Sequence, residues 1–204
     1  MQNNTDNSII KEEKRDLMSK NIGIMCSSNK NCNLESRMLA ENIAQAISKT
    51  DFGVVMGSGM TGLMGQIKEI FSENQVPLEV VGVEGDDDLE MSVGDLKVTA
   101  PSSFARTEHL YQDSDIILFL PGGVGTLSEF YSMLDYKLEK GEGKPLILYN
   151  EDHSFDLVLK DIKERSTKGG FIDPKALFDF EVVNNQKEFD QVCQKYQEEK
   201  ERIR

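Results

Sequence analysis

Cysteine, histidine and long apolar runs are scarce in this chain, and each scarcity excludes a class of protein. Its three cysteines among 204 residues are too few and too scattered for a disulfide framework or a zinc site, and they fit a reducing compartment. The two histidines, His109 and His153, lack the spacing of metal ligands, so we expect no metal. No run approaches the length of a membrane span, and residues 1–20 lack the apolar core of a signal peptide. A cytoplasmic protein without a membrane partner is therefore expected.

Basic residues are also in short supply. There are 36 acidic residues against 23 basic ones, which gives a formal net charge of −13. This balance argues against a nucleic-acid partner or a broad surface for anionic lipid. A phosphate ligand would have to be held by backbone dipoles and by one or two basic side chains.

What the chain does contain is an alternation of short apolar runs and amphipathic helical patterns, which predicts an α/β fold with a mostly parallel sheet. Residues 1–20 are expected to form a flexible tail, residues 21–204 a single nucleotide-binding domain, and the acidic stretch 84–95 a loop. Strands are predicted at residues 22–26, 52–56, 78–83, 115–120, 145–149 and 180–183, and helices at 34–49, 63–71, 103–111, 127–136, 155–165 and from 186 onward.

The most informative segment follows the predicted strand at 115–120. It reads Pro121-Gly-Gly-Val-Gly-Thr126, and a helical pattern that contains Glu129 comes next. Three glycines between a strand and a helix allow a tight turn and expose backbone N–H groups, which with the helix N-terminus form a site for an anion such as phosphate. A carboxylate at such a site indicates chemistry, because phosphate binding needs no negative neighbour. The structural alternative is a capping box, in which Thr126 caps the helix and Glu129 reaches back to it.

A second glycine-rich turn, Gly57-Ser-Gly-Met-Thr-Gly62, lies between another predicted strand and helix. Parallel strands end at the same edge of a sheet, so we expect both loops at one ligand-binding edge. This G-x-G-x-x-G pattern also permits a dinucleotide-dependent oxidoreductase with Glu79 or Glu84 as the ribose acid, although it falls in the second βα unit. Neither loop is followed by a Walker lysine, and the chain has no credible Ser/His/Asp or Cys/His set.

These motifs resemble those of the LOG ("lonely guy") family, cytokinin-activating phosphoribohydrolases that were long labelled lysine decarboxylases. Residues 121–129 match the family's P-G-G-x-G-T-x-x-E in full, and residues 57–65 are similar to its G-G-G-x-x-G-L-M-G, with Ser58 in place of a glycine. Arg106 stands at the arginine of the family's M-H-x-R-K-x-x-M, where Thr107 replaces the lysine. Residues 26–28 resemble its C-G-S-S turn, with Ser27 in place of glycine.

The resemblance implies a doubly wound, Rossmann-like three-layer sandwich and a homodimer. It also implies a phosphoribohydrolase that needs no cofactor and that cleaves AMP or a cytokinin riboside 5′-monophosphate to the free base and ribose 5-phosphate. By motif match, Glu129 and Arg106 would be catalytic. The carboxylate would stabilise an oxocarbenium-like state and orient or deprotonate water, while the guanidinium would hold phosphate or assist the departing base. The expected phosphate- and ribose-binding residues are Gly57, Ser58, Gly59, Gly62, Gly122, Gly123, Gly125 and Thr126.

Two further alternatives remain open at this point, besides the oxidoreductase and the capping box. A non-catalytic nucleotide or molybdenum-cofactor carrier of the same fold also has P-G-G-x-G-T loops, and the departures at Ser58, Thr107 and Gly169 indicate a diverged member. For Arg106 the structural alternative is a surface arginine that pairs with Glu108 or Asp113.

Overall fold

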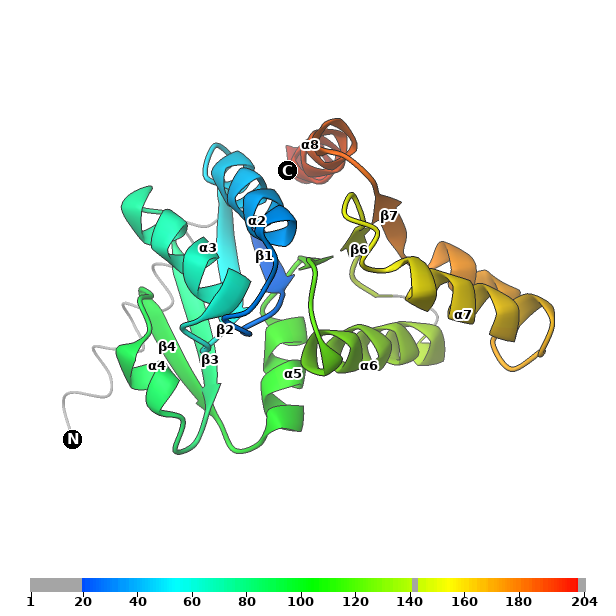
Figure 1. Cartoon of the computed structure of the whole chain (residues 1–204), viewed down its shortest axis with the longest axis horizontal. Helices are drawn as coiled ribbons and strands as arrows, with labels where there is room; N and C mark the ends of the chain where they lie inside the picture. Colours follow the sequence, from blue (N-terminus) through cyan, green and yellow to red (C-terminus); the bar gives the residue numbers. More distant parts are fainter. Residues whose placement is uncertain (1–19, 141–142, 202–204) are drawn as a thin grey trace.

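A computed structural model describes residues 20–140 and 143–201, which share one seven-stranded sheet (Figure 1). All neighbouring strands are parallel, and their order is β4-β3-β2-β1-β5-β6-β7. The predicted tail lies outside the described residues except for Lys20, which begins the first strand. The strands are β1 (Lys20–Met25), β2 (Phe52–Gly57), β3 (Leu78–Val83), β4 (Leu96–Ala100), β5 (Ile116–Phe119), β6 (Leu146–Tyr149) and β7 (Glu181–Val183).

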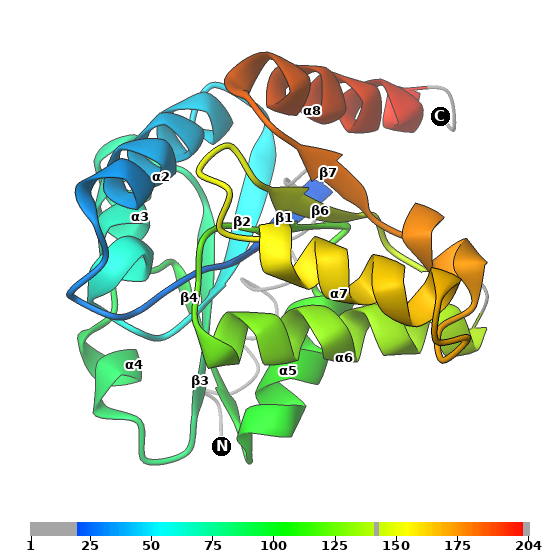
Figure 2. The same ribbon diagram turned by 45° about the vertical axis from the view of Figure 1, so that its right-hand side comes forward.

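Helices cover both faces of the sheet. One face carries α2 (Leu34–Ile47), α3 (Gly62–Glu73) and α8 (Gln186–Glu201), and the other carries α5 (Ser103–Gln112), α6 (Val124–Lys140) and α7 (Asp156–Thr167). Figure 2 shows α8 on the side of the sheet opposite α6 and α7. The short helices α4 (Asp87–Met91) and η1 (Pro174–Phe178) complete the described set. The predicted doubly wound three-layer fold is therefore confirmed.

Burial on both faces explains why the strands read as continuous apolar runs. In β5, Ile116 and Leu118 point into the core beneath α2, α3 and α8, whereas Ile117 and Phe119 point into the core beneath α5, α6 and α7. All four side chains of this strand are at most 2% exposed. A strand buried in this way near the centre of the sheet gives the loop at its end a fixed position.

The prediction of a loop over residues 84–95 was wrong in part. Asp86 accepts a hydrogen bond from the N–H of Asp88 and caps α4, whose Leu89 is buried in the core. The edge strand β4 follows and was not predicted, because its side chains are alternately half-buried and exposed and give no continuous apolar run. Helix α6 also begins at Val124, three residues before the predicted start at 127.

Among the described residues, none of the helices has both the length and the apolar character that crossing a membrane requires.

Candidate active site

The strand order reverses between β1 and β5, because the chain runs outward from β1 to β4 on one side and from β5 to β7 on the other. Such a switch point leaves a crevice at the carboxyl ends of the strands, where ligands bind in open α/β sheets. A pocket of about 350 Å³ occupies this place. Its walls come from the segments after β1, β2 and β3, from α5, and from the first turns of α6.

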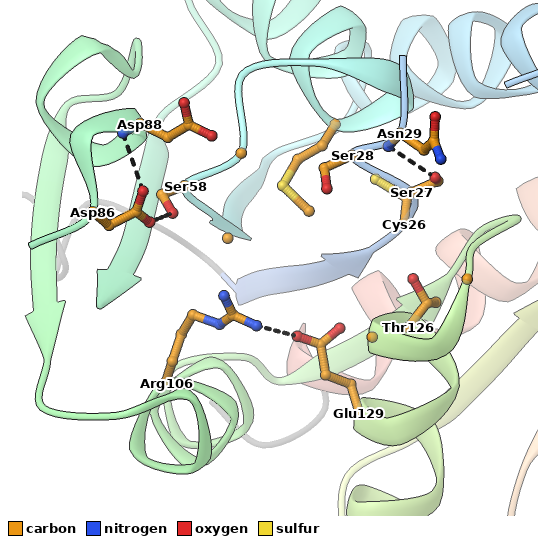
Figure 3. Close-up of a pocket in the computed structure, with 15 residues that line it drawn as sticks. Cys26, Ser27, Ser28, Asn29, Ser58, Asp86, Asp88, Arg106, Thr126 and Glu129 are labelled. Atoms are coloured by element: carbon orange, nitrogen blue, oxygen red, sulfur yellow. Dashed lines mark hydrogen bonds and ion pairs between the residues drawn. The ribbon is translucent and has the colours of Figure 1, made fainter. Parts of the chain in front are cut away.

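Glu129 and Arg106 meet in this pocket, although 23 positions separate them in the chain. Nη2 of Arg106 donates to Oε1 of Glu129 over 3.4 Å (Figure 3). The Glu129 side chain is 12% exposed and that of Arg106 is 28% exposed. Burial raises the pKa of the Glu129 carboxyl, and the nearby Arg106 only partly opposes this effect. The carboxylate is therefore a stronger base than an exposed glutamate would be.

The capping-box interpretation of Glu129 was wrong. Helix α6 begins at Val124, and Leu127 N–H bonds to the carbonyl of Gly123, so Thr126 lies inside the first turn and is not the cap. The surface alternative for Arg106 was wrong too, since its ion pair is with Glu129 rather than with Glu108 or Asp113. Neither side chain is accounted for by the local structural role that the sequence allowed.

Six of the eight predicted phosphate- and ribose-binding residues line the pocket, and two do not. The two exceptions shape the backbone. Gly62 has a φ of +64°, and a Cβ there would lie 2.6 Å from the carbonyl oxygen of Asn29. A Cβ on Gly122 would lie 2.1 Å from Oγ1 of Thr126. The six that face the pocket are Gly57, Ser58, Gly59, Gly123, Gly125 and Thr126.

The N-terminus of α6 opens into the pocket without side-chain cover. A Cβ built on Gly123 or Gly125 would meet no atom within 4 Å, so both glycines leave room beside the backbone. The first N–H groups of a helix have no intrahelical partner, and the helix dipole adds partial positive charge there. An anion of phosphate size can be held at this position, with Arg106 as the one basic side chain among the described residues that line the pocket.

Several lining residues were missed by the sequence analysis. The segment after β1 contributes residues 26–29, and its resemblance to the C-G-S-S turn was the signal that could have identified it. Burial, and secondly the negative Glu129, raises the pKa of the Cys26 thiol, so this thiol is unsuited to act as a thiolate nucleophile. Asp86 and Asp88 also line the pocket, but the acidic stretch that contains them gave no such signal.

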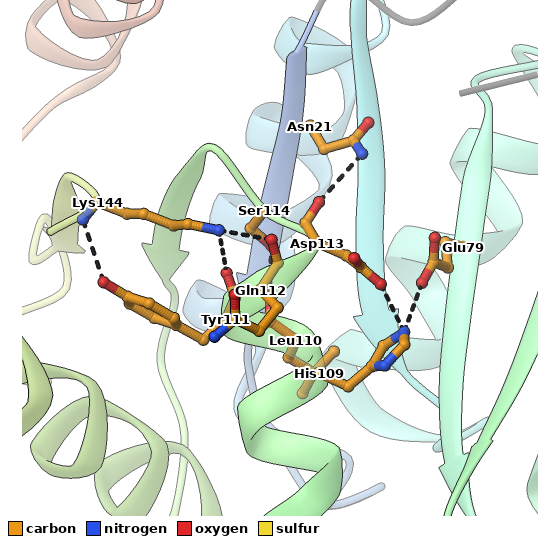
Figure 4. A network of polar contacts seen from close by, with 9 residues as sticks. All are labelled: Asn21, Glu79, His109, Leu110, Tyr111, Gln112, Asp113, Ser114 and Lys144. Atoms are coloured by element: carbon orange, nitrogen blue, oxygen red, sulfur yellow. Dashed lines mark hydrogen bonds and ion pairs between the residues drawn. The ribbon is translucent and has the colours of Figure 1, made fainter. Parts of the chain in front are cut away.

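A polar network holds α5, and thereby Arg106, against the sheet. Nε2 of His109 lies 3.1 Å from Oε1 of Glu79 on β3 and 2.5 Å from Oδ2 of Asp113 (Figure 4). Ser102 caps the other end of α5 by accepting from the N–H of Ala105. The ligand-type atoms of Glu79, His109 and Asp113 all lie within 4.8 Å of one another, which is a group that could hold a metal ion. Histidine spacing could not reveal this group, because Glu79 comes from β3, whereas His109 and Asp113 lie one turn apart at the C-terminal end of α5.

Comparisons with known proteins point to one family. The family model described as "Possible lysine decarboxylase" matches residues 50–192. A "Probable cytokinin riboside 5'-monophosphate phosphoribohydrolase LOGL5" of Oryza sativa subsp. japonica is 24% identical over 75% of this chain, and the match spans 63% of that protein. The "Cytokinin riboside 5'-monophosphate phosphoribohydrolase LOG1" of Arabidopsis thaliana is 25% identical over 77% of this chain and 74% of that protein.

Among solved structures, the molybdenum cofactor binding protein of Rippkaea orientalis superposes with a TM-score of 0.63. It is 16% identical, and the match covers 87% of this chain and 96% of that one. At this identity the likeness shows the fold alone.

Proposed function

This chain belongs to the family described as "Possible lysine decarboxylase", the LOG family that its glycine-rich motifs resemble, and we propose that it hydrolyses the N-glycosidic bond of a nucleoside 5′-monophosphate. The products would be the free base and ribose 5-phosphate. The observation that carries this proposal is the largely buried Glu129 carboxylate, which is paired with Arg106 and lies less than two turns inside a helix whose open N-terminus suits a phosphate.

The proposed reaction adds water across the bond between C1′ of the ribose and the base nitrogen. As that bond breaks, its electron pair leaves with the base, and positive charge develops on the sugar as in other glycosyl transfers. The Glu129 carboxylate stabilises this charge and accepts a proton from the attacking water, for which its raised pKa suits it. The base takes up a proton, and the hydroxyl joins C1′.

Arg106 has two roles that fit its position. Its guanidinium keeps Glu129 oriented, and its remaining N–H groups can donate to the substrate's phosphate or base. The α6 N-terminus and Arg106 together supply the positive potential that a chain of net charge −13 otherwise lacks. A nucleotide would therefore be held by its phosphate at α6, with its ribose beside Glu129.

The family's description as a possible lysine decarboxylase finds little support in the pocket chemistry. Within the described part of the chain, no lysine lines this pocket. A pyridoxal-phosphate decarboxylase needs such a lysine to hold its cofactor as a Schiff base.

The test is incubation with AMP and with isopentenyladenosine monophosphate, followed by chromatography for free base and ribose 5-phosphate. We expect both products in equal amounts, and we expect Glu129→Gln to slow their formation by ~100-fold or more. A protein that binds AMP but releases no base from either nucleotide would be a carrier, the alternative that the P-G-G-x-G-T loop allows.

A further inference from the structure

The side of the pocket away from α6 is walled by two carboxylates. Asp86 and Asp88, from the segment after β3, lie across the pocket from Thr126, and the Arg106–Glu129 pair lies between them (Figure 3). A carboxylate accepts hydrogen bonds and donates none. The ligand group that reaches this wall must therefore supply donors.

Asp86 is held in a fixed orientation. Its Oδ2 accepts the hydroxyl proton of Ser58, and its Oδ1 accepts from the N–H of Asp88 over 3.1 Å. Ser58 is only 3% exposed, so its one proton is committed to Asp86. Two of the roughly four acceptor positions of the carboxylate are used in this way, and the others remain for a ligand. Ser58 stands where the family motif has a glycine, so this contact is a feature of this chain.

A buried lysine ties the two segments that build this wall together. Lys68 is fully buried, and its Nζ donates to the carbonyl of Gly59 over 2.9 Å and to Oγ of Ser92 over 3.1 Å. Gly59 belongs to the loop that carries Ser58, and Ser92 directly follows the helix that Asp86 caps. The ammonium thus fixes the distance between both parts of the wall and offsets part of their negative charge.

The distance across the sheet between the α6 N-terminus and Asp86 determines which part of a bound ligand can reach Asp86 and Asp88. The segment with Asp86 follows β3, and the α6 N-terminus follows β5, with β2 and β1 between them. Three strand spacings amount to about 14 Å. That span is comparable with an extended nucleoside monophosphate. With phosphate at α6 and ribose beside Glu129, the base extends toward Asp86 and Asp88.

We propose that Asp86, oriented by Ser58, selects nucleotides whose base carries an amino group and rejects those with a carbonyl in its place. This inference rests on the proposed nucleotide site and specifies its substrate class. An exocyclic amino group, as in adenine or cytosine, donates to the carboxylate. The carbonyl of hypoxanthine or uracil brings an acceptor against an acceptor and leaves both unpaired, which is costly in a partly buried site.

The experiment compares two pairs of nucleotides that differ at this one group, AMP with IMP and CMP with UMP. We expect kcat/KM to favour the amino member of each pair by at least ~10-fold, the scale of one hydrogen bond to a charged acceptor. Asp86→Asn should bring both ratios close to one, because an amide can turn its NH₂ toward a carbonyl. Asparagine is also a good helix cap, so the variant keeps α4.

Asp87→Asn is the matched control. It makes the same change on the neighbouring residue, which is exposed and does not line the pocket, so both ratios should stay at the wild-type value. Dissociation constants for the four nucleotides, measured by calorimetry, provide a second readout. Lack of turnover would refute the proposed hydrolase, while a binding preference for AMP over IMP that Asp86→Asn removes would still support the role of Asp86. Equal affinity for AMP and IMP, or a preference that Asp86→Asn leaves intact, would overturn it.

Discussion

Glu129→Gln tests the central claim, because the structure separates the effect of this change on catalysis from its effect on stability. Glutamine keeps the size and one acceptor oxygen of glutamate, so it can still receive the Nη2–H of Arg106. It carries no negative charge for the sugar cation and is a poor base. Loss of one such preorganised group lowers kcat by ~100-fold or more, which is about 2.7 kcal/mol of transition-state stabilisation.

The thermal stability of Glu129→Gln, unlike its kcat, should stay the same or increase at neutral pH. Because burial raises the pKa of Glu129, the folded protein binds this proton more tightly than the unfolded chain does. The charged carboxylate therefore destabilises the fold at neutral pH, and this penalty disappears as the pH falls through the raised pKa to the ordinary value of 4.5. Glutamine never carries the penalty. The variant should thus melt at the same temperature as the wild type or higher at neutral pH, and the difference should vanish in acid.

The assay pairs base release from AMP with calorimetric melting over a range of pH. Glu139→Gln is the control, since Glu139 lies on the same helix with its side chain 69% exposed and lines no part of the pocket. It should change neither quantity appreciably. Near-normal turnover by Glu129→Gln would refute a catalytic role, and a clear loss of melting temperature would refute the inferred burial penalty.

Three further expectations follow from the same geometry. AMP should be cleaved at least ~100-fold better than adenosine, as judged by kcat/KM, because the open α6 N-terminus can hold the phosphate. Equal values would exclude a phosphate site there. Arg106→Ala should abolish measurable base release while circular dichroism still shows a folded chain. Arg106→Lys should recover little of this activity, because lysine lacks the planar guanidinium fork. Activity that survives both changes would show that Arg106 is not part of the site. Burial lowers the pKa of Lys68 from 10.5 to about 8. As the pH is raised through this range, the unfolding free energy of the wild type should therefore increase relative to that of Lys68→Met, by up to ~3 kcal/mol. A pH-independent difference in urea unfolding would contradict this.

The local features of this protein could be predicted from its sequence because they follow from short-range patterns. Continuous apolar runs such as residues 116–119 mark strands that are covered on both faces. The glycines at 122, 123 and 125 mark a tight turn into a helix, and the motif ending at Glu129 identifies the family. Patterns that depend on the environment were less informative. The half-exposed edge strand at 96–100 and the start of α6 at Val124 were missed, because partial burial and helix starts are decided by neighbours that are distant in sequence.

The composition of the pocket was decided by the tertiary structure. Sequence order places Arg106 and Glu129 on separate helices, and only the packing of α5 and α6 beside the end of β5 brings them to 3.4 Å. The contact between Ser58 and Asp86 depends on β2 and β3 being neighbours in the sheet. Strand order follows from the long-range burial of both faces, which no local window of sequence contains. The chain's own residues thus determined which chemistry was available, and the order of its strands determined which of those groups share one pocket.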